Sequence, residues 1–239
     1  MNQITSAVLV LISINVLLFG INSITTFELN QWFALYYPDH PNYGLWQYIS
    51  SMFMHGSVPH LLFNMFGLYM FGSALERVWG SQKFLFFYFA AGIGAGIIYT
   101  LVNYFQFTTA FETFLSLGLT NYQIQDILET ARYNAQTPGL KVDMLTAFYS
   151  TYHTPMVGAS GAIYGVLVAF AIRYPNTKLF LLFIPFPIAA KFFVPVLLLL
   201  DLFSGVTGFS LFGGGIAHFA HLGGALVGFF LVLYWRNIK

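Results

Sequence analysis

The chain has 239 residues, of which 58% are hydrophobic and 20% aromatic, and its formal net charge is +1. Only 7% of the residues are charged, against about 25% in soluble domains. So few charged side chains cannot cover the apolar surface of the chain, and most of that surface must therefore face lipid. This composition excludes a soluble domain, a disordered chain and a nucleic-acid partner. The absence of cysteine excludes disulfides, a thiol nucleophile and a thiolate metal site.

Apolar stretches of about 20 residues, long enough to cross a bilayer, predict six transmembrane helices. They cover about residues 4–21, 53–75, 84–105, 156–173, 179–200 and 214–235. The first stretch has neither a positively charged start nor a small-residue cleavage site, so we expect a retained span rather than a signal peptide. The sequence thus predicts an all-α polytopic membrane protein, with residues 1–239 as a single domain built on a six-helix bundle.

Two segments between these helices are longer than simple connections. Residues 22–48 contain many aromatic side chains among prolines, which is typical of interfacial structure in the headgroup layer, although such side chains also serve only to anchor helix ends. Residues 106–155 form an outer insertion, and a helical period near 121–133 predicts a surface helix within it.

Loop charges predict the orientation of the chain. Six crossings place both termini on one side of the membrane. That side carries Arg77, Lys83, Arg173, Lys178, Arg236 and Lys239, whereas the opposite side carries Arg132 and Lys141. The excess of basic residues marks the cytoplasmic side. Together with the lack of a transit peptide, this indicates a prokaryotic plasma membrane with cytoplasmic termini and a site that opens outward.

Polar residues inside the spans are the candidates for chemistry, because each is costly in lipid. They lie near the outer ends of three spans: His55, His60 and Asn64 in the second, Gly158-Ala159-Ser160-Gly161 in the fourth, and His218 and His221 in the sixth. His60 and Asn64 are four residues apart and share one helical face. The common depth of these residues points to one site.

Glycines form a smooth stripe on two of these helices. The stripes consist of Gly161 and Gly165 on the fourth span, and of Gly224 and Gly228 on the sixth, on the face that bears His221. Such stripes permit close backbone approach. If they meet, Ser160 and His221 come within hydrogen-bond reach, which is the geometry of a serine nucleophile activated by a base.

An acyl transfer also needs donors for the oxyanion. The side chains of His60 and Asn64 and the backbone N–H of Ser160, near a helix start, are candidates. Neither Glu76 nor Asp201 lies on a face that obviously reaches His221, so the sequence predicts a Ser-His dyad. Spacing alone leaves open whether His218 or His221 is the base.

Other interpretations account for single features. The Gly-Ala-Ser-Gly run is also a packing motif, and a membrane histidine often bonds a carbonyl or faces a cavity. A proton relay through the histidines predicts polar residues in the inner halves of the spans, where the residues are aliphatic and aromatic. A zinc enzyme predicts His-Glu-x-x-His spacing, which is absent from the sequence. It also predicts an inward carboxylate near the histidines, and we expect none there. We therefore expect no metal and no cofactor.

Taken together, the motifs resemble those of the rhomboid family of intramembrane serine proteases, over about residues 50–235. The resemblance rests on His55 with His60-Leu61-Leu62-Phe63-Asn64, on Gly158-Ala159-Ser160-Gly161 with Gly165, and on Ala217-His218-Phe219-Ala220-His221-Leu222-Gly223-Gly224 with Gly228. It implies that Ser160 is the nucleophile, that His221 rather than His218 is the base, and that His60, Asn64 and Ser160 form the oxyanion hole. It also implies structural support from His55, Gly158, Gly161, Gly165, Gly224 and Gly228.

The same resemblance implies a rhomboid-like bundle of the prokaryotic six-span type. Its expected partners are the bilayer and single-span membrane proteins, which it would cleave near the outer face. Two departures are visible: Trp46-Gln47 stands where the family has a Trp-Arg pair, and the outer insertion is long. A catalytically dead relative that only binds is the alternative, against which the retained Ser160 and His221 argue.

Access to such a site requires an opening in the bundle. The fifth span carries Pro185, Pro187 and Pro195, and residues 201–215 after it combine glycines with apolar residues. These features predict that the fifth span and the segment after it form a lateral gate and cap.

Overall fold

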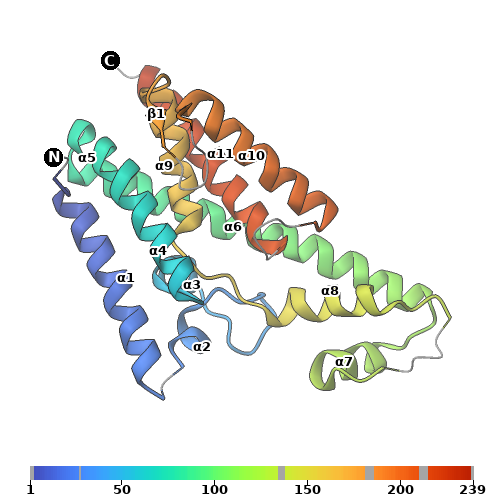
Figure 1. The fold of residues 1–239 in the computed structure, drawn as a ribbon. Coiled ribbons are helices and arrows are strands. Elements are labelled where there is room, and N and C mark those ends of the chain that lie inside the picture. The colour runs from blue at the N-terminus through green and yellow to red at the C-terminus, as the bar shows by residue number, and fades with distance from the viewer. Residues whose placement is uncertain (1–2, 27, 134–137, 181–185, 210–214, 238–239) are drawn as a thin grey trace.

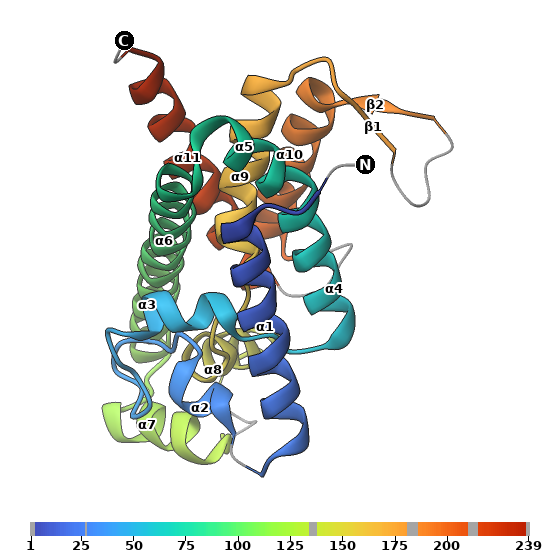
Figure 2. The same ribbon diagram turned by 90° about the vertical axis from the view of Figure 1, so that its left-hand side faces the viewer.

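The computed structural model describes residues 3–26, 28–133, 138–180, 186–209 and 215–237 (Figures 1 and 2). The first half of the chain forms α1 (Ser6–Ile24), α2 (Leu29–Phe33), α3 (Gln47–Ser50), the 3₁₀ turn η1 (Ser51–Phe53), α4 (Val58–Gly67), the π-helical turn η2 (Leu68–Gly72), α5 (Ser73–Trp79) and α6 (Ser81–Ser116). The second half forms α7 (Asn121–Thr130), α8 (Val142–His153), α9 (Ser160–Arg173), β1 (Lys178–Leu179), β2 (Ile188–Ala189), α10 (Ala190–Thr207) and α11 (Gly215–Asn237).

The helices form a membrane bundle around α9. Within the described residues, five helical stretches are long and apolar enough to span a bilayer: α1, the run from α4 to α5, α6, α10 and most of α11. The sixth pass, α9, has only 14 residues, or about 21 Å at 1.5 Å per residue. It lies at the centre of the bundle in both views (Figures 1 and 2), and nine of its 14 residues are buried. The prediction of an all-α polytopic membrane bundle is confirmed.

Both termini lie at the same end of the bundle (Figure 1). The buried Glu76 ties the start of α1 to this end, because its carboxylate accepts hydrogen bonds from the backbone N–H groups of Ala7 (2.9 Å) and Val8 (3.0 Å). The hydroxyls of Thr5 and Ser81 donate to the same carboxylate. A carboxylate at a helix N-terminus satisfies unpaired backbone donors and complements the helix dipole. Below, the inner side means this terminal end and the outer side the opposite one.

Two of the expected span boundaries are wrong. The third span, α6, continues to Ser116 instead of ending near 105. The fifth span, α10, begins at Ala190 instead of 179, because the short strands β1 and β2 before it pair antiparallel, with Lys178 opposite Ala189. Hydropathy does not separate an apolar hairpin from an apolar helix. Consequently residues 201–207, expected in a loop, are helical, whereas Pro185 and residues 210–214 lie outside the described residues.

The outer insertion folds as a small helical unit. The outer end of α6 packs with α7 and α8 around a cluster of its own: Phe114, Leu119, Ile124, Ile127, Leu128, Leu145 and Phe148. A capping box between Thr120 and Gln123 starts α7. The surface helix expected near 121–133 is present as α7, and α8 was not anticipated.

The first outer loop is held by one buried amide. Gln47 has no exposed surface; its Nε2 donates to the carbonyl of Asn42 at 2.6 Å, and its Oε1 accepts from the N–H of Tyr36 at 3.2 Å. The indole of Trp46 donates to the carbonyl of Trp32 at 2.8 Å, and both tryptophans are more than half exposed. Large exposed aromatic rings on a fixed loop suit the headgroup layer.

Candidate active site

The loop that leads into α9 fixes the position of Ser160. Met156 pairs with Leu35 of the first outer loop through two backbone hydrogen bonds of 2.8 and 2.9 Å, and the N–H of Gly158 donates to the carbonyl of Ser51 at 2.9 Å. Gly158 has φ +119°, a conformation that side-chain-bearing residues rarely adopt. Irregular backbone is tolerated at membrane depth only where protein satisfies it, and these contacts do so.

Ser160, the first residue of α9, meets His221 of α11. The Oγ of Ser160 lies 2.8 Å from the Nε2 of His221. The glycine stripes on the two helices face each other: a Cβ on Gly224 would lie 1.9 Å from the carbonyl oxygen of Gly161, and one on Gly228 would lie 2.6 Å from the Cα of Gly165. Backbone contact between α9 and α11 therefore brings the hydroxyl and the imidazole together.

Tyr164 stacks on the imidazole of His221. The ring centroids are 4.2 Å apart and the planes differ by 8°. Tyr164 lies one helical turn after Ser160, so it shares the face that points to α11. Tyr164 is not among the residues predicted from the sequence, although its spacing of four from Ser160 places it on the same helical face.

His60 and Asn64 of α4 border the turn before Ser160. A Cβ on Gly158 would lie 2.7 Å from the Nε2 of His60 and 3.4 Å from the Nδ2 of Asn64. The Nδ2 of Asn64 is also 2.9 Å from the Nε2 of His55. An amide nitrogen only donates, so this contact uses one N–H of Asn64 and leaves the second N–H for a ligand at the turn. A side chain at position 158 would therefore overlap the imidazole of His60.

Asp201 of α10 lies beside the two histidines of α11. Its Oδ1 accepts hydrogen bonds from the Nδ1 of His218 and, at 3.3 Å, from the Nδ1 of His221, and Asp201 is only 5% exposed. The expectation that no carboxylate reaches His221 is therefore wrong. Because α10 starts at Ala190 and runs to Thr207, Asp201 sits within a helix that packs on α11 rather than at a helix end. Asp201 could have been recognised from the sequence, because a carboxylate within an apolar stretch is costly and therefore indicates a function.

The same three residues could also hold a metal ion. One donor atom from each of Asp201, His218 and His221 lies within 4.8 Å of the others. Imidazole and carboxylate are ligands that suit a transition metal. The hydrogen bonds described above use the same atoms, so the two uses exclude each other.

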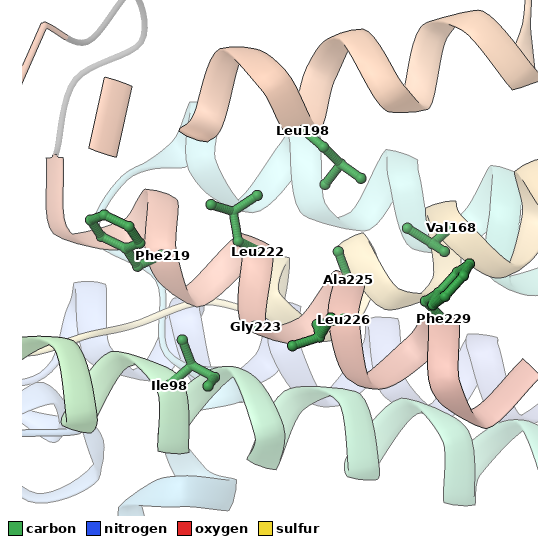
Figure 3. Close-up of a pocket in the computed structure, with 9 residues that line it drawn as sticks. All are labelled: Ile98, Val168, Leu198, Phe219, Leu222, Gly223, Ala225, Leu226 and Phe229. Carbon is green, nitrogen blue, oxygen red and sulfur yellow. The ribbon is translucent and has the colours of Figure 1, made fainter. Parts of the chain in front are cut away.

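An apolar hollow of about 380 Å³ runs along α11 between α6 and α10 (Figure 3). It is lined by Ile98, Val168, Leu198, Phe219, Leu222, Gly223, Ala225, Leu226 and Phe229. No lining side chain can donate, accept or transfer a proton. This surface suits hydrocarbon, and neither Ser160 nor His221 lines it.

Comparisons with known proteins indicate the family of the chain. A family model described as the Rhomboid domain matches residues 42–125 and 126–237. The chain is 28% identical over 193 residues to the mitochondrial presenilin-associated rhomboid-like protein of Bos taurus, a match that covers 78% of this chain and 38% of that protein. It is 27% identical over 195 residues to the mitochondrial RHOMBOID-like protein 12 of Arabidopsis thaliana, covering 80% of this chain and 46% of that protein. The chain thus spans less than half the length of these relatives.

The relatives correct the expected location. A further relative, a mitochondrial rhomboid protein of Schizosaccharomyces pombe, is 28% identical over 163 residues and covers 63% of this chain and 40% of that protein. All three relatives are mitochondrial by name. The expectation of a prokaryotic plasma membrane is contradicted by these matches. The multi-pass membrane character is supported.

Proposed function

The chain belongs to the rhomboid family, and from this premise we propose that it is a serine endopeptidase that cuts membrane proteins within the bilayer, with Ser160 as nucleophile and His221 as general base. Membership of the family supports intramembrane protease activity in general. The contact of 2.8 Å between Ser160 Oγ and His221 Nε2 is the observation that carries the assignment of residues. We also infer that residues 1–239 act as one membrane domain.

The reaction begins with the transfer of a proton. As the Oγ of Ser160 bonds to the scissile carbonyl carbon, its proton passes to the Nε2 of His221 and the carbonyl π electrons move to the oxygen. The imidazolium then gives that proton to the leaving amine nitrogen when the C–N bond breaks, which leaves an acyl-enzyme on Ser160. Water hydrolyses the ester by the same steps, with His221 again as the base.

The tetrahedral intermediate carries a negative charge on the former carbonyl oxygen. We propose that the side chains of His60 and Asn64, with the backbone N–H of Ser160, donate to this oxygen. Their position around the turn at Gly158 supports the assignment. Preformed donors in a site that excludes water stabilise such a charge strongly, and one donor is typically worth about 10²- to 10³-fold in kcat.

The depth of the site indicates the class of substrate. Because α9 is shorter than the roughly 30 Å hydrocarbon core, Ser160 at its outer end can sit below the membrane surface. A transmembrane helix there must unwind before its carbonyl can be attacked, and unwound backbone needs protein or water partners. We therefore propose single-span membrane proteins with helix-weakening residues near their outer ends as substrates.

We propose that substrates reach Ser160 between α4 and α10. Among the described residues, α10 packs mainly on α11 and α9, whereas α4 packs mainly on α1 and α9. The chain has no cysteine, so one introduced on α4 and one on α10 form a unique pair for crosslinking. The crosslink should block cleavage of a membrane-embedded substrate and spare a short soluble peptide. Full cleavage of the embedded substrate by the crosslinked protein would refute this route.

Substitution of the nucleophile tests the proposed function. The detergent-solubilised protein is incubated with a tagged single-span substrate and, separately, with a fluorophosphonate probe. Ser160→Ala should abolish both cleavage and labelling, whereas Ser73→Ala, which removes another buried serine from a membrane helix, should retain both. His221→Ala should be as inactive as Ser160→Ala. Cleavage by folded Ser160→Ala at the wild-type rate would refute Ser160 as the nucleophile, whereas a wild-type protein that neither cleaves the substrate nor reacts with the probe would leave only a binding role for the fold.

A further inference from the structure

We propose that Asp201 is a positioning residue for His221, so that the site works as a Ser-His-Asp triad in which His218 shares the carboxylate. The inference rests on the proposed function, since it concerns how the base at Ser160 is held. It changes the expected dyad, because the orienting group comes from α10, a helix that the dyad does not use.

The hydrogen bonds determine which nitrogen of His221 carries the proton. An ionised carboxylate can only accept, so the Nδ1 of His221, 3.3 Å from the Oδ1 of Asp201, carries a hydrogen. In a neutral imidazole the Nε2 is then the bare nitrogen. This is the atom that faces the Ser160 hydroxyl at 2.8 Å. Asp201 therefore selects the tautomer that can take the serine proton.

The burial of Asp201 implies that its carboxylate needs hydrogen-bond donors from neighbouring helices. A carboxylate that is only 5% exposed in a membrane bundle is costly unless donors compensate its charge. The Oδ1 of Asp201 receives both imidazole donors of α11, from His218 and from His221. Since His218 is equally buried, its donor helps to fix the carboxylate in the orientation that reaches His221.

Three elements besides α11 present ionisable groups to His221. They are Asp201 on α10, Tyr164 on α9 and His60 on α4, and His218 lies on the same helix as His221. Asp201 is the only carboxylate among them. When the proton of Ser160 arrives at Nε2, the new positive charge lies next to this carboxylate, which stabilises it while the Nδ1 proton stays on the histidine.

The test is the isosteric substitution Asp201→Asn, measured as kcat and KM for the tagged substrate. The asparagine amide keeps the shape of the Asp201 side chain, but it no longer forces His221 to carry its hydrogen on Nδ1. We expect kcat to fall between about 10²-fold, the effect of misplacing a reacting group by about 1 Å, and about 10⁴-fold, the effect of the same substitution in a serine protease triad. KM should stay nearly unchanged. Ser204→Ala is the matched control, because Ser204 is as buried as Asp201 and lies one turn later on α10.

The rate–pH profile separates positioning from a merely structural role. In Asp201→Asn the acid limb of kcat/KM should move to lower pH, since a neutral amide no longer favours the imidazolium of His221. A purely structural defect would lower the rate equally at every pH. His218→Gln should reduce kcat less than Asp201→Asn does.

Further measurements keep the proposal falsifiable if Asp201→Asn does not fold. In wild-type protein labelled with ¹⁵N-histidine, the His221 signal should show a protonated Nδ1 and a bare Nε2; the opposite tautomer would overturn the proposal. A chelator should leave activity unchanged, and loss of activity restored by Zn²⁺ would make the three residues a metal site instead. If Ser160→Ala is inactive but folded Asp201→Asn has wild-type kcat, the positioning role of Asp201 is refuted while the proposed function stands.

Discussion

The contact between the backbones of α9 and α11 predicts a large effect of a single added methyl group at Gly224. The Cβ of Gly224→Ala would lie 1.9 Å from the carbonyl oxygen and 2.7 Å from the carbonyl carbon of Gly161, whereas ordinary contact begins at 3.4 Å. Both contacted atoms are backbone, so no side-chain rotation relieves the overlap. The two helices must therefore separate by about 1.5 Å at this point.

That separation would lengthen the distance between Ser160 and His221, because Gly161 follows Ser160 directly and Gly224 lies one turn after His221. If the hydrogen bond took up the whole shift, its length would increase from 2.8 Å to about 4.3 Å, beyond hydrogen-bond range. A misplacement of about 1 Å can lower the rate by about 10²-fold, so we expect Gly224→Ala to lose at least that much in kcat. Fluorophosphonate labelling should slow in parallel.

Two further glycine variants serve as controls, with folding checked by thermal unfolding. Gly20→Ala in α1 adds a methyl group to open space and should keep full activity, with a stability gain of about 0.5–1 kcal/mol. Gly228→Ala overlaps Gly165 one turn further from the site and should destabilise the bundle with a smaller loss of kcat. A folded Gly224→Ala protein with kcat within a few-fold of wild type would show that the backbone contact does not set the geometry of the site.

Three other predictions concern separate parts of the molecule. Asn64→Ala should lower kcat by about 10²- to 10³-fold with little change in KM, if its free N–H donates to the oxyanion; unchanged steady-state turnover would remove it from the site. Glu76→Ala removes the acceptor at the start of α1 and should lower the free energy of unfolding by about 1–3 kcal/mol, measured by denaturant unfolding of the solubilised protein, without changing kcat per folded molecule. Burial, and then the nearby His153, lower the pKa of His40 in the first outer loop. The folded state then binds fewer protons than the unfolded state, so this contribution to stability is present above pH 6.5 and declines as the pH falls below it. The hydrogen-exchange protection factors of α8 should fall as the pH drops below 6.5, and His40→Gln should reduce this dependence on pH.

Much of this protein follows from local sequence. Hydropathy predicts the bundle because any apolar stretch of about 20 residues is solvated by lipid whatever its neighbours are. The residues of the candidate site are also visible in the sequence: Ser160, His221, His60 and Asn64 stand out because polar groups inside apolar helices are energetically costly. The glycine spacing indicated which helix faces meet, since only glycine permits backbones to touch.

Other features depend on how segments distant in sequence pack together. The start of α10 is decided by the pairing of Lys178 with Ala189, and the hydropathy of that segment is the same in a strand as in a helix. This shift places Asp201 inside α10 and against α11, next to His221, a contact between residues 20 apart that no periodicity within one helix encodes. The stacking of Tyr164 on His221 depends likewise on the close approach of α9 and α11. The sequence therefore pointed to Ser160 and, through the family resemblance, to His221, but Asp201 and Tyr164, which contact His221, come from other helices, and only the tertiary structure shows which of their faces turn toward it.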